Sequence, residues 1–188
     1  RNFELLELDI RKLETNLQIF KNIDCIFHLA GIGDIVPSIE KPGEYLEVNV
    51  QGTVRVVEAA RWNGVRRFVY AASSSCYGLA SVPTDETHPI DPKYPYALSK
   101  YLGEQVAFHW GLTYRIEVNS ICIFNAYGPR VKTNGVYGAV FGVFLKQKLE
   151  NAPLTIVGDG FQSRDFVHVK DVAISLSTKS WFDFLGRE

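Results

Sequence analysis

A chain of 188 residues, 46% of them hydrophobic and 22% charged, is long enough to bury one sizeable core and is typical of a soluble globular protein. Its net charge of -1 provides no basic field for a phosphate backbone, so we expect no nucleic-acid partner. No apolar run approaches the roughly 18 residues of a membrane span, and the three cysteines are spaced for reduced thiols rather than for disulfides or a metal site. These features predict a cytoplasmic protein with no membrane contact.

Strand-like and helix-like segments alternate along the chain. In chain order the sequence predicts strands at 3–8 and 24–30, a helix at 42–60, a strand at 67–72, a helix at 96–111, a strand at 116–124, a helix at 140–149, a strand at 154–157 and a helix at 169–180. This alternation predicts an α/β fold with a mainly parallel sheet covered by helices. In such folds ligands bind where the strands end.

A glycine-rich phosphate loop is missing from this pattern. A dinucleotide-binding domain normally opens with a strand and Gly-x-Gly-x-x-Gly, yet that motif occurs nowhere in the chain. Gly31-Ile-Gly33 fails because Val36 occupies the third glycine position. Either the chain binds no dinucleotide, or the first β-α-β unit lies outside it.

Tyr96 and Lys100 lie four residues apart in the predicted helix 96–111, so both fall on one helix face. A tyrosine needs its pKa lowered by about 3 units, which costs about 4 kcal/mol, to act as a base near neutral pH. A neighbouring ammonium supplies roughly 1 to 4 kcal/mol of that. The pair suits proton removal from a hydroxyl, although the spacing alone also arises by chance and is a weak motif.

Six short motifs, taken together, resemble those of the extended short-chain dehydrogenase/reductase family, in both order and approximate spacing. They are His28-Leu-Ala-Gly31, Asn49-Val-Gln-Gly-Thr53, Ser73-Ser-Ser-Cys-Tyr-Gly78, Tyr96-x-x-x-Lys100, Phe124-Asn-Ala-Tyr-Gly-Pro129 and Arg164-Asp-Phe-Val-His168. The resemblance covers nearly the whole chain. It is strongest to the nucleotide-sugar epimerase/dehydratase branch, and within it to UDP-sugar 4-epimerases.

The resemblance implies a Rossmann-like, doubly wound parallel sheet that lacks its first β-α-β unit. It further implies a partial NAD-binding domain at 1–130, and part of a small C-terminal substrate domain with returning Rossmann elements at 131–188. The glycine-rich loop is then expected upstream of the chain. The helices 42–60 and 96–111 resemble the pair that forms a four-helix interface, which implies a homodimer; the alternative is that their apolar residues face the sheet.

NAD is the cofactor that the resemblance implies, bound by residues spread along the first two thirds of the chain. The implied NAD contacts are Asp9 and Ile10 at the adenine, Leu29, Ala30 and Gly31 along the cofactor, and Asn49, Tyr96, Lys100 and Phe124 at the nicotinamide side. Each of these positions has a plainer interpretation. Asp9 is equally well placed as a helix N-cap before Arg11, Asn49 as a polar helix residue, and Phe124 as core packing. His28 is interpreted as a packed core histidine rather than a ligand.

The serine run separates two reactions of the branch. By resemblance Ser73, Tyr96 and Lys100 are the catalytic residues, with Ser73 sharing the proton path of Tyr96. Ser74 and Ser75 stand where related 4,6-dehydratases carry Asp and Glu, and loss of water needs such an acid and base. The run therefore favours 4-epimerisation over dehydration.

The resemblance implies a nucleotide-sugar substrate, UDP-linked as in the UDP-sugar enzymes that the chain resembles. Ser74, Ser75, Asn125 and Arg164 are its implied contacts. An arginine fork suits a diphosphate, although Arg164 beside Asp165 also suits a plain ion pair. Two alternatives remain open: a nucleotide-sugar 4,6-dehydratase, and a catalytically silent dinucleotide-fold module. The identity of the sugar is also left open.

Overall fold

The computed structural model describes residues 3–14, 18–131, 133, 140–156 and 158–178. The chain forms two compact units, one built from the residues up to Cys122 and one from Ile123 to Thr178. The sequence predicts functional domains at 1–130 and 131–188. The two compact units do not test the functions of those domains, so this division stays a prediction.

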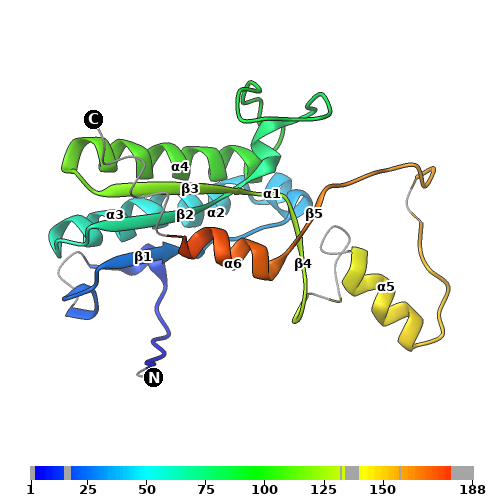
Figure 1. The fold of residues 1–188 in the computed structure, drawn as a ribbon, viewed down its shortest axis with the longest axis horizontal. Helices are drawn as coiled ribbons and strands as arrows, with labels where there is room; N and C mark the ends of the chain where they lie inside the picture. Colours follow the sequence, from blue (N-terminus) through cyan, green and yellow to red (C-terminus); the bar gives the residue numbers. More distant parts are fainter. Residues whose placement is uncertain (1–2, 15–17, 132, 134–139, 157, 179–188) are drawn as a thin grey trace. The chain divides into compact units, whose positions relative to one another are not determined.

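A three-stranded sheet in the order β1-β2-β3 forms the base of the first unit (Figure 1). Its strands are β1 (Cys25–His28), β2 (Arg67–Ser73) and β3 (Glu117–Ile123). Strands β1 and β2 are parallel, and their register pairs Ile26 with Phe68 and His28 with Tyr70. Because alternate residues of a strand face the same side, these four side chains share one face of the sheet.

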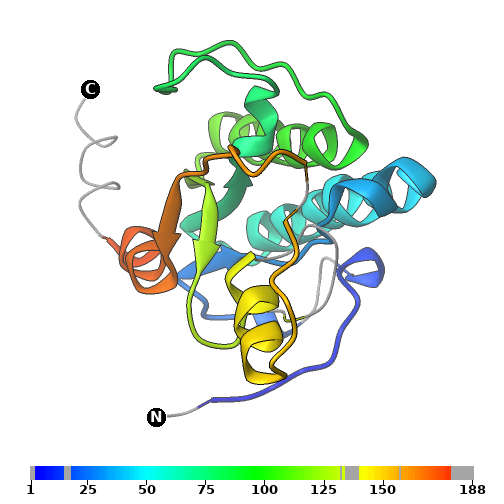
Figure 2. The ribbon, with the colours of Figure 1, turned by 90° about the vertical axis from the view of Figure 1, so that its right-hand side faces the viewer.

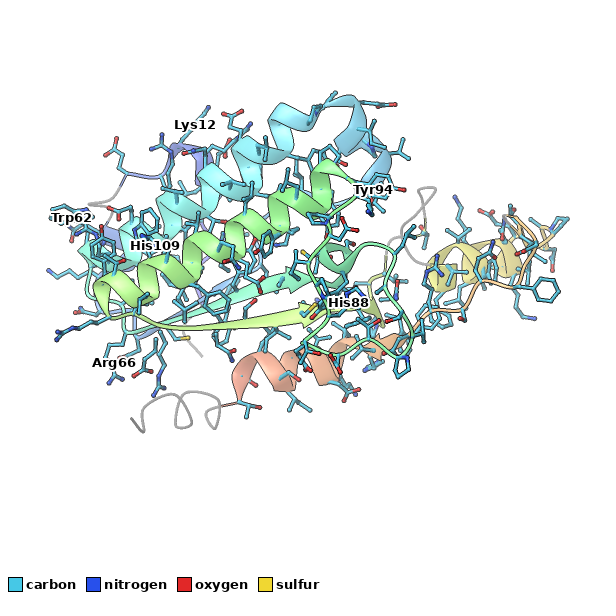
Figure 3. The ribbon with its side chains drawn as sticks, turned by 90° about the horizontal axis from the view of Figure 1, so that it is seen from above. Lys12, Trp62, Arg66, His88, Tyr94 and His109 are labelled. Carbon is cyan, nitrogen blue, oxygen red and sulfur yellow. The ribbon has the colours of Figure 1, made fainter. Side chains whose placement is uncertain are left out.

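Two long helices, α3 (Gly52–Trp62) and α4 (Pro95–Tyr114), lie side by side over that face. Figure 3 shows Trp62 of α3 and His109 of α4 near the same end of the helix pair. Three shorter segments precede α3: α1 (Ile35–Glu40), α2 (Pro42–Leu46) and the π-helical turn η3 (Glu47–Gln51). The helical path is thus continuous from Pro42 to Trp62, which confirms the predicted helix 42–60.

The ends of these helices follow from local chemistry. Pro95 occupies the first turn of α4, where its missing N–H costs no helical hydrogen bond. Arg115 ends α4 in the left-handed region at φ 59°, and its N–H donates to the carbonyl oxygen of Gly111. Gly64 follows α3 at φ 68°, a conformation that glycine adopts without strain. Asn63-Gly64 therefore closes this helix, as the sequence indicates.

The core of the first unit lies between β2 and the two helices. It includes Val57 and Ala60 of α3, Phe68 and Tyr70 of β2, and Ala107 of α4, all fully buried. Each large apolar side chain buried in this way contributes about 1.5 to 3 kcal/mol. This layer fixes the start of α4 against the carboxyl end of β2, which is where the predicted catalytic residues lie.

The second unit contains a parallel strand pair, β4 (Asn125–Tyr127) and β5 (Phe166–His168), which lie side by side in Figure 2. Helix α6 (Val169–Ser177) continues directly from β5, and α5 (Val140–Leu149) belongs to the same unit. The rings of Phe141 and Phe166 pack with their centroids 4.7 Å apart, and both contact Tyr127. Aromatic contacts thus join α5 to the strand pair.

Three short helical turns complete the described elements: η1 (Ile10–Lys12), η2 (Gln18–Phe20) and η4 (Ser74–Tyr77). Within the described residues no helix is both long and apolar enough to cross a membrane.

Two strand predictions are wrong. Residues 3–8 form no strand, and Phe3 is 84% exposed. Residues 154–156 likewise form no strand, and Leu154 and Ile156 are exposed. Val157 lies outside the described residues. Strand propensity describes how side chains fit a sheet, and a strand also needs a neighbour with which to pair.

The other predicted elements are confirmed within a few residues. The predicted strands 24–30, 67–72 and 116–124 contain or nearly match β1, β2 and β3, and the predicted helices 96–111 and 140–149 correspond to α4 and α5. Helix α6 ends at Ser177, three residues before the predicted end, and residues 179–180 lie outside the described chain.

Candidate active site

Ser73 and Tyr96 meet although they are 23 residues apart in the sequence. Strand β2 ends at Ser73, and α4 begins at Pro95, so Tyr96 lies in the first turn of the helix. The Tyr96 hydroxyl donates to Ser73 Oγ at 3.4 Å. Both hydroxyls lie at the carboxyl end of a sheet strand, where α/β folds bind their ligands.

Burial is the main influence on the proton of Tyr96. It raises the pKa of the phenol, and the hydrogen bond with Ser73 lowers this pKa by less. The sequence predicts that Lys100 lowers the Tyr96 pKa, but the net shift is upward. The Lys100 ammonium lies 4.4 Å from the centroid of the Tyr70 ring. A phenolate at Tyr96 near neutral pH therefore needs further positive charge.

Lys100 is itself buried, with 9% of its surface exposed. Burial lowers the pKa of its ammonium to about 8, and the nearby Cys76 and Glu104 act in the opposite direction. An amine with this pKa is still largely protonated at pH 7. Lys100 can therefore donate hydrogen bonds to ligand hydroxyls at neutral pH.

Asn49 ties the loop after β1 to the first turn of α4. Its side-chain amide donates to the carbonyl of Ile32 at 3.0 Å and to Ser99 Oγ at 2.9 Å, and its Oδ1 accepts from the Ile32 N–H at 2.8 Å. Ser99 in turn donates to the carbonyl of Tyr96. Asn49 is 1% exposed, so in this structure it is a buried clamp beside the start of α4.

The sequence interpretation missed Ser99. Its signal was its position inside Tyr-Ala-Leu-Ser-Lys, three residues after Tyr96 and so one helical turn along. A small hydroxyl residue there suits a buried contact with the polar side chain of another helix.

Leu29, Ala30 and Gly31 follow directly on the carboxyl end of β1, and all three are exposed. A side chain at position 31 would bring its Cβ within 2.9 Å of Asn49 Oδ1. The glycine thus leaves the backbone open beside the clamp. An exposed, partly side-chain-free backbone at a strand end fits a bound dinucleotide, which needs close backbone approach.

Asp9 and Ile10 have local contacts of their own. The Asp9 carboxylate caps η1 by accepting from the Arg11 N–H, and it forms an ion pair with the Arg11 guanidinium at 2.6 Å. This pairing lowers the pKa of Asp9 to about 2. The Ile10 side chain packs on Gly52, where an added Cβ would lie 2.6 Å from Ile10 Cδ1. The cap interpretation of Asp9 describes this structure, and contact with adenine stays a prediction.

Ser74 and Ser75 begin η4, directly after Ser73. The Ser75 N–H donates to Ser73 Oγ at 3.3 Å, so the turn also holds the hydroxyl that accepts from Tyr96. Both serines are half-buried and carry hydroxyls rather than carboxylates. Neither supplies a proton donor or acceptor that titrates near neutral pH.

The remaining predicted contacts lie in the second unit. Asn125 is the first residue of β4 and donates its amide to the carbonyl of Asp165 at 2.9 Å. Arg164 is exposed and donates to the carbonyl of Ser163 at 2.7 Å. It lies two residues before Phe166, the β5 partner of Asn125, so the unit brings Asn125 and Arg164 to the same end of its strand pair. Phe124 is half-buried just before β4.

His28 is a core residue, as the sequence indicates. It is 3% exposed, and its Nε2 lies 2.9 Å from Thr53 Oγ1. Thr53 donates its own proton to the carbonyl of Asn49, so His28 Nε2 carries the hydrogen in this bond. Burial lowers the pKa of His28 to about 4, which keeps the ring neutral at pH 7. Among the described residues, no group of three or more His, Cys, Asp or Glu side chains is placed to hold a metal ion.

The chain is similar to known proteins that include nucleotide-sugar enzymes. Residues 1–177 match the family described as "NAD dependent epimerase/dehydratase family". The UDP-glucose 4-epimerase of Mycolicibacterium smegmatis is 38% identical over 173 residues, which are 90% of this chain and 55% of that protein. The chain thus spans about half the length of the curated relatives that it matches.

Two solved structures show the likeness in three dimensions. A UDP-N-acetylglucosamine 4-epimerase from Methanobrevibacter ruminantium superimposes with a TM-score of 0.87 at 29% identity, covering 91% of this chain and 55% of that one. A dTDP-glucose 4,6-dehydratase from Streptomyces venezuelae, solved with NAD bound, gives a TM-score of 0.77 at 30% identity, covering 87% and 50%. The predicted Rossmann-like α/β fold is confirmed by these matches.

Proposed function

The chain belongs to the NAD-dependent epimerase/dehydratase family, and we propose that the protein containing it is an NAD-dependent UDP-sugar 4-epimerase. The observation that carries the proposal is the Tyr96–Ser73 hydroxyl pair in contact with a serine turn that lacks carboxylates. The pair can move one proton at a carbinol. The turn offers no acid for the loss of water.

In this mechanism the chain's residues handle the proton and the orientation of the sugar. Tyr96 takes the proton of the 4-hydroxyl, and Ser73 bridges the sugar oxygen and the phenol. Lys100 would donate to the ribose hydroxyls of the cofactor, while Leu29, Ala30 and Gly31 would line it. Bound NAD supplies the hydride acceptor for C4 and a positive charge that favours the Tyr96 phenolate. The 4-keto sugar would then present its other face, where the hydride removed from C4 would return to C4 and Tyr96 would give its proton back to the oxygen.

Two side chains of the second unit are proposed substrate contacts. Asn125 and Arg164 offer an amide and a planar guanidinium, which suit sugar hydroxyls and a diphosphate. Contacts of Asp9 and Ile10 with adenine belong to the same proposal.

The free thiols of Cys25, Cys76 and Cys122 support the cytoplasm as the compartment.

Isotopic labelling of C4 tests whether hydride returns to the carbon that it left. We expect the complete protein, given UDP-glucose with deuterium at C4 and no added cofactor, to produce UDP-galactose with the deuterium still at C4. Deuterium NMR reads the position of the label. Unlabelled UDP-glucose with protein in deuterated water is the control, and it should gain no deuterium at C4. Loss of the label to solvent or its transfer to C6 would contradict the mechanism.

A homodimer is the assembly that we propose for the complete protein. Helices α3 and α4 leave large apolar side chains exposed, among them Trp62, Phe108 and Leu112, of which Leu112 is 85% exposed. Val106, by contrast, packs against the core of the first unit, as the alternative interpretation expects. A second copy that covers the exposed side chains would remove this surface from water.

Light scattering at micromolar concentration tests the dimer. We expect the mass of a dimer for the wild type and of a monomer for Leu112→Glu, because a buried carboxylate would have no partner in the interface. Leu149→Glu is the matched control, since Leu149 is similarly exposed but lies on α5, and it should remain dimeric. A wild-type monomer would sink this part of the proposal.

A further inference from the structure

Tyr70 contacts Lys100 at two points, through its hydroxyl and through its ring. The Tyr70 hydroxyl donates to the carbonyl oxygen of Lys100 at 3.1 Å, and the Lys100 ammonium lies 4.4 Å from the centroid of the Tyr70 ring. The lysine side chain therefore folds back across the ring whose hydroxyl holds its own backbone. Tyr70 is fully buried, and its burial raises the pKa of the phenol, so the hydroxyl stays protonated and remains a donor.

The surroundings of the Lys100 ammonium make this ring contact significant. Among the described residues, no carboxylate lies within 4.0 Å of its nitrogen. Burial opposes the charged form, and Glu104 of the same helix favours it at longer range. The pKa of about 8 is one unit above neutral, so each contact that favours the ammonium matters. The face of an aromatic ring attracts a cation by roughly 0.5 to 2 kcal/mol, more when water is excluded.

Tyr70 is held in this position from two sides. His28 of β1, its partner in the sheet register, packs on it with ring centroids 5.7 Å apart. Because the pKa of His28 is lowered to about 4, this ring brings no second positive charge toward Lys100 at pH 7. On the helix side, a Cβ at Gly103 would lie 2.5 Å from the Tyr70 hydroxyl oxygen. The missing side chain of Gly103 thus makes room for the hydroxyl.

We propose that Tyr70 is a positioning residue for Lys100, which it orients and keeps protonated. The inference rests on the proposed function, in which the charged form of Lys100 holds the ribose hydroxyls of NAD. Tyr70 acts through Lys100 and touches neither the sugar nor the cofactor in this scheme. Its role differs from that of Phe68, which lies on the same strand and face, is equally buried and packs on the same His28 ring at 5.6 Å.

Carbon NMR of lysine-labelled complete protein, without substrate, measures the Lys100 pKa directly. The signal is assigned by its loss in Lys100→Arg. We expect Tyr70→Leu to lower the pKa of Lys100 by roughly 0.5 to 1.5 units, the shift that a lost cation–π contact implies. Tyr70→Phe keeps the ring and should retain most of the wild-type value. Phe68→Leu is the matched control for the lost volume and should leave the Lys100 pKa in place. An unchanged or raised pKa in Tyr70→Leu would overturn the proposal.

A second series guards against a Tyr70→Leu variant that does not fold. Fluorination of the ring in Tyr70→Phe withdraws electrons from its face while hardly changing its size. The pKa of Lys100 should then fall stepwise as fluorine atoms are added, because each one weakens the attraction for the ammonium. A pKa independent of fluorination would be equally decisive against the role of the ring.

The pH profile of turnover links the titration to the reaction. The ammonium is the required form, so a lower Lys100 pKa means that activity is lost at a lower pH on the alkaline side. The alkaline limb of the Tyr70→Leu profile should move to lower pH by the same amount as the Lys100 pKa measured by NMR. The alkaline limb of the Phe68→Leu profile should not move. The NMR result stands whether or not the protein is an epimerase. A correct pKa shift with no sugar epimerisation would therefore count against the proposed function and leave the Tyr70–Lys100 contact intact.

Discussion

Replacing Tyr96 with phenylalanine should lower turnover of the complete protein by at least about a hundredfold and leave substrate binding nearly intact. The change removes the hydroxyl that donates to Ser73 Oγ at 3.4 Å and almost no surface. A positioned general base contributes roughly 10² to 10⁴ in rate. Because the ring remains, uniform binding of the nucleotide sugar should change little, and the loss should appear in kcat rather than in KM.

Tyr101→Phe is the matched control for this experiment. It removes a hydroxyl from the same helix at a half-buried position that is not assigned to the site. Steady-state rates with UDP-sugar, together with calorimetric binding, separate turnover from affinity. Tyr96→Phe with the turnover of the wild type would remove Tyr96 from the mechanism.

The pH dependence follows from the same phenol. Burial raises the Tyr96 pKa in the chain itself, and the reactive form is the deprotonated one. Turnover of the wild type should therefore rise with pH on its acidic side. The residual activity of Tyr96→Phe should lack that rise.

Much of the site was predictable because its key pairs are close in sequence or follow local rules. Tyr96 and Lys100 are one helical turn apart, and Ser73 ends an apolar run that is β2. Pro95 before Tyr96 and Gly64 after α3 mark helix ends that side chains and backbone angles enforce locally. The elements that carry these residues were therefore found within a few positions.

Long-range contacts account for what sequence reasoning missed. The strand pattern treats Tyr70 as an ordinary strand residue, and the positioning role proposed for it depends on Gly103 and Lys100, about thirty positions later in the chain. The upward shift of the Tyr96 pKa comes mainly from burial of the phenol, which depends on tertiary packing that the sequence pattern does not show. The apolar pattern of residues 3–8 predicts a strand, but that pattern cannot tell whether a pairing strand is beside them.

The second large effect concerns the outcome of the reaction. Both an epimerase and a 4,6-dehydratase remove hydride from C4, but a dehydratase delivers it to C6 after water has left. With Ser74 and Ser75 in η4, a 4-keto intermediate would have no carboxylic acid at these positions to protonate the leaving hydroxyl. The absence of that help should slow dehydration by roughly 10² to 10⁴. Reduction at C4 should therefore be faster than the loss of water.

Carbon NMR of the products tests the central claim most directly. The complete protein is incubated with UDP-glucose labelled with carbon-13 throughout the sugar, with no added cofactor, and in parallel as Tyr96→Phe. The account predicts a mixture of gluco and galacto forms with a C4 carbinol signal in both, formed far more slowly by the variant. A stable C4 carbonyl accompanied by a C6 methyl signal would contradict it and assign the protein to the dehydratases.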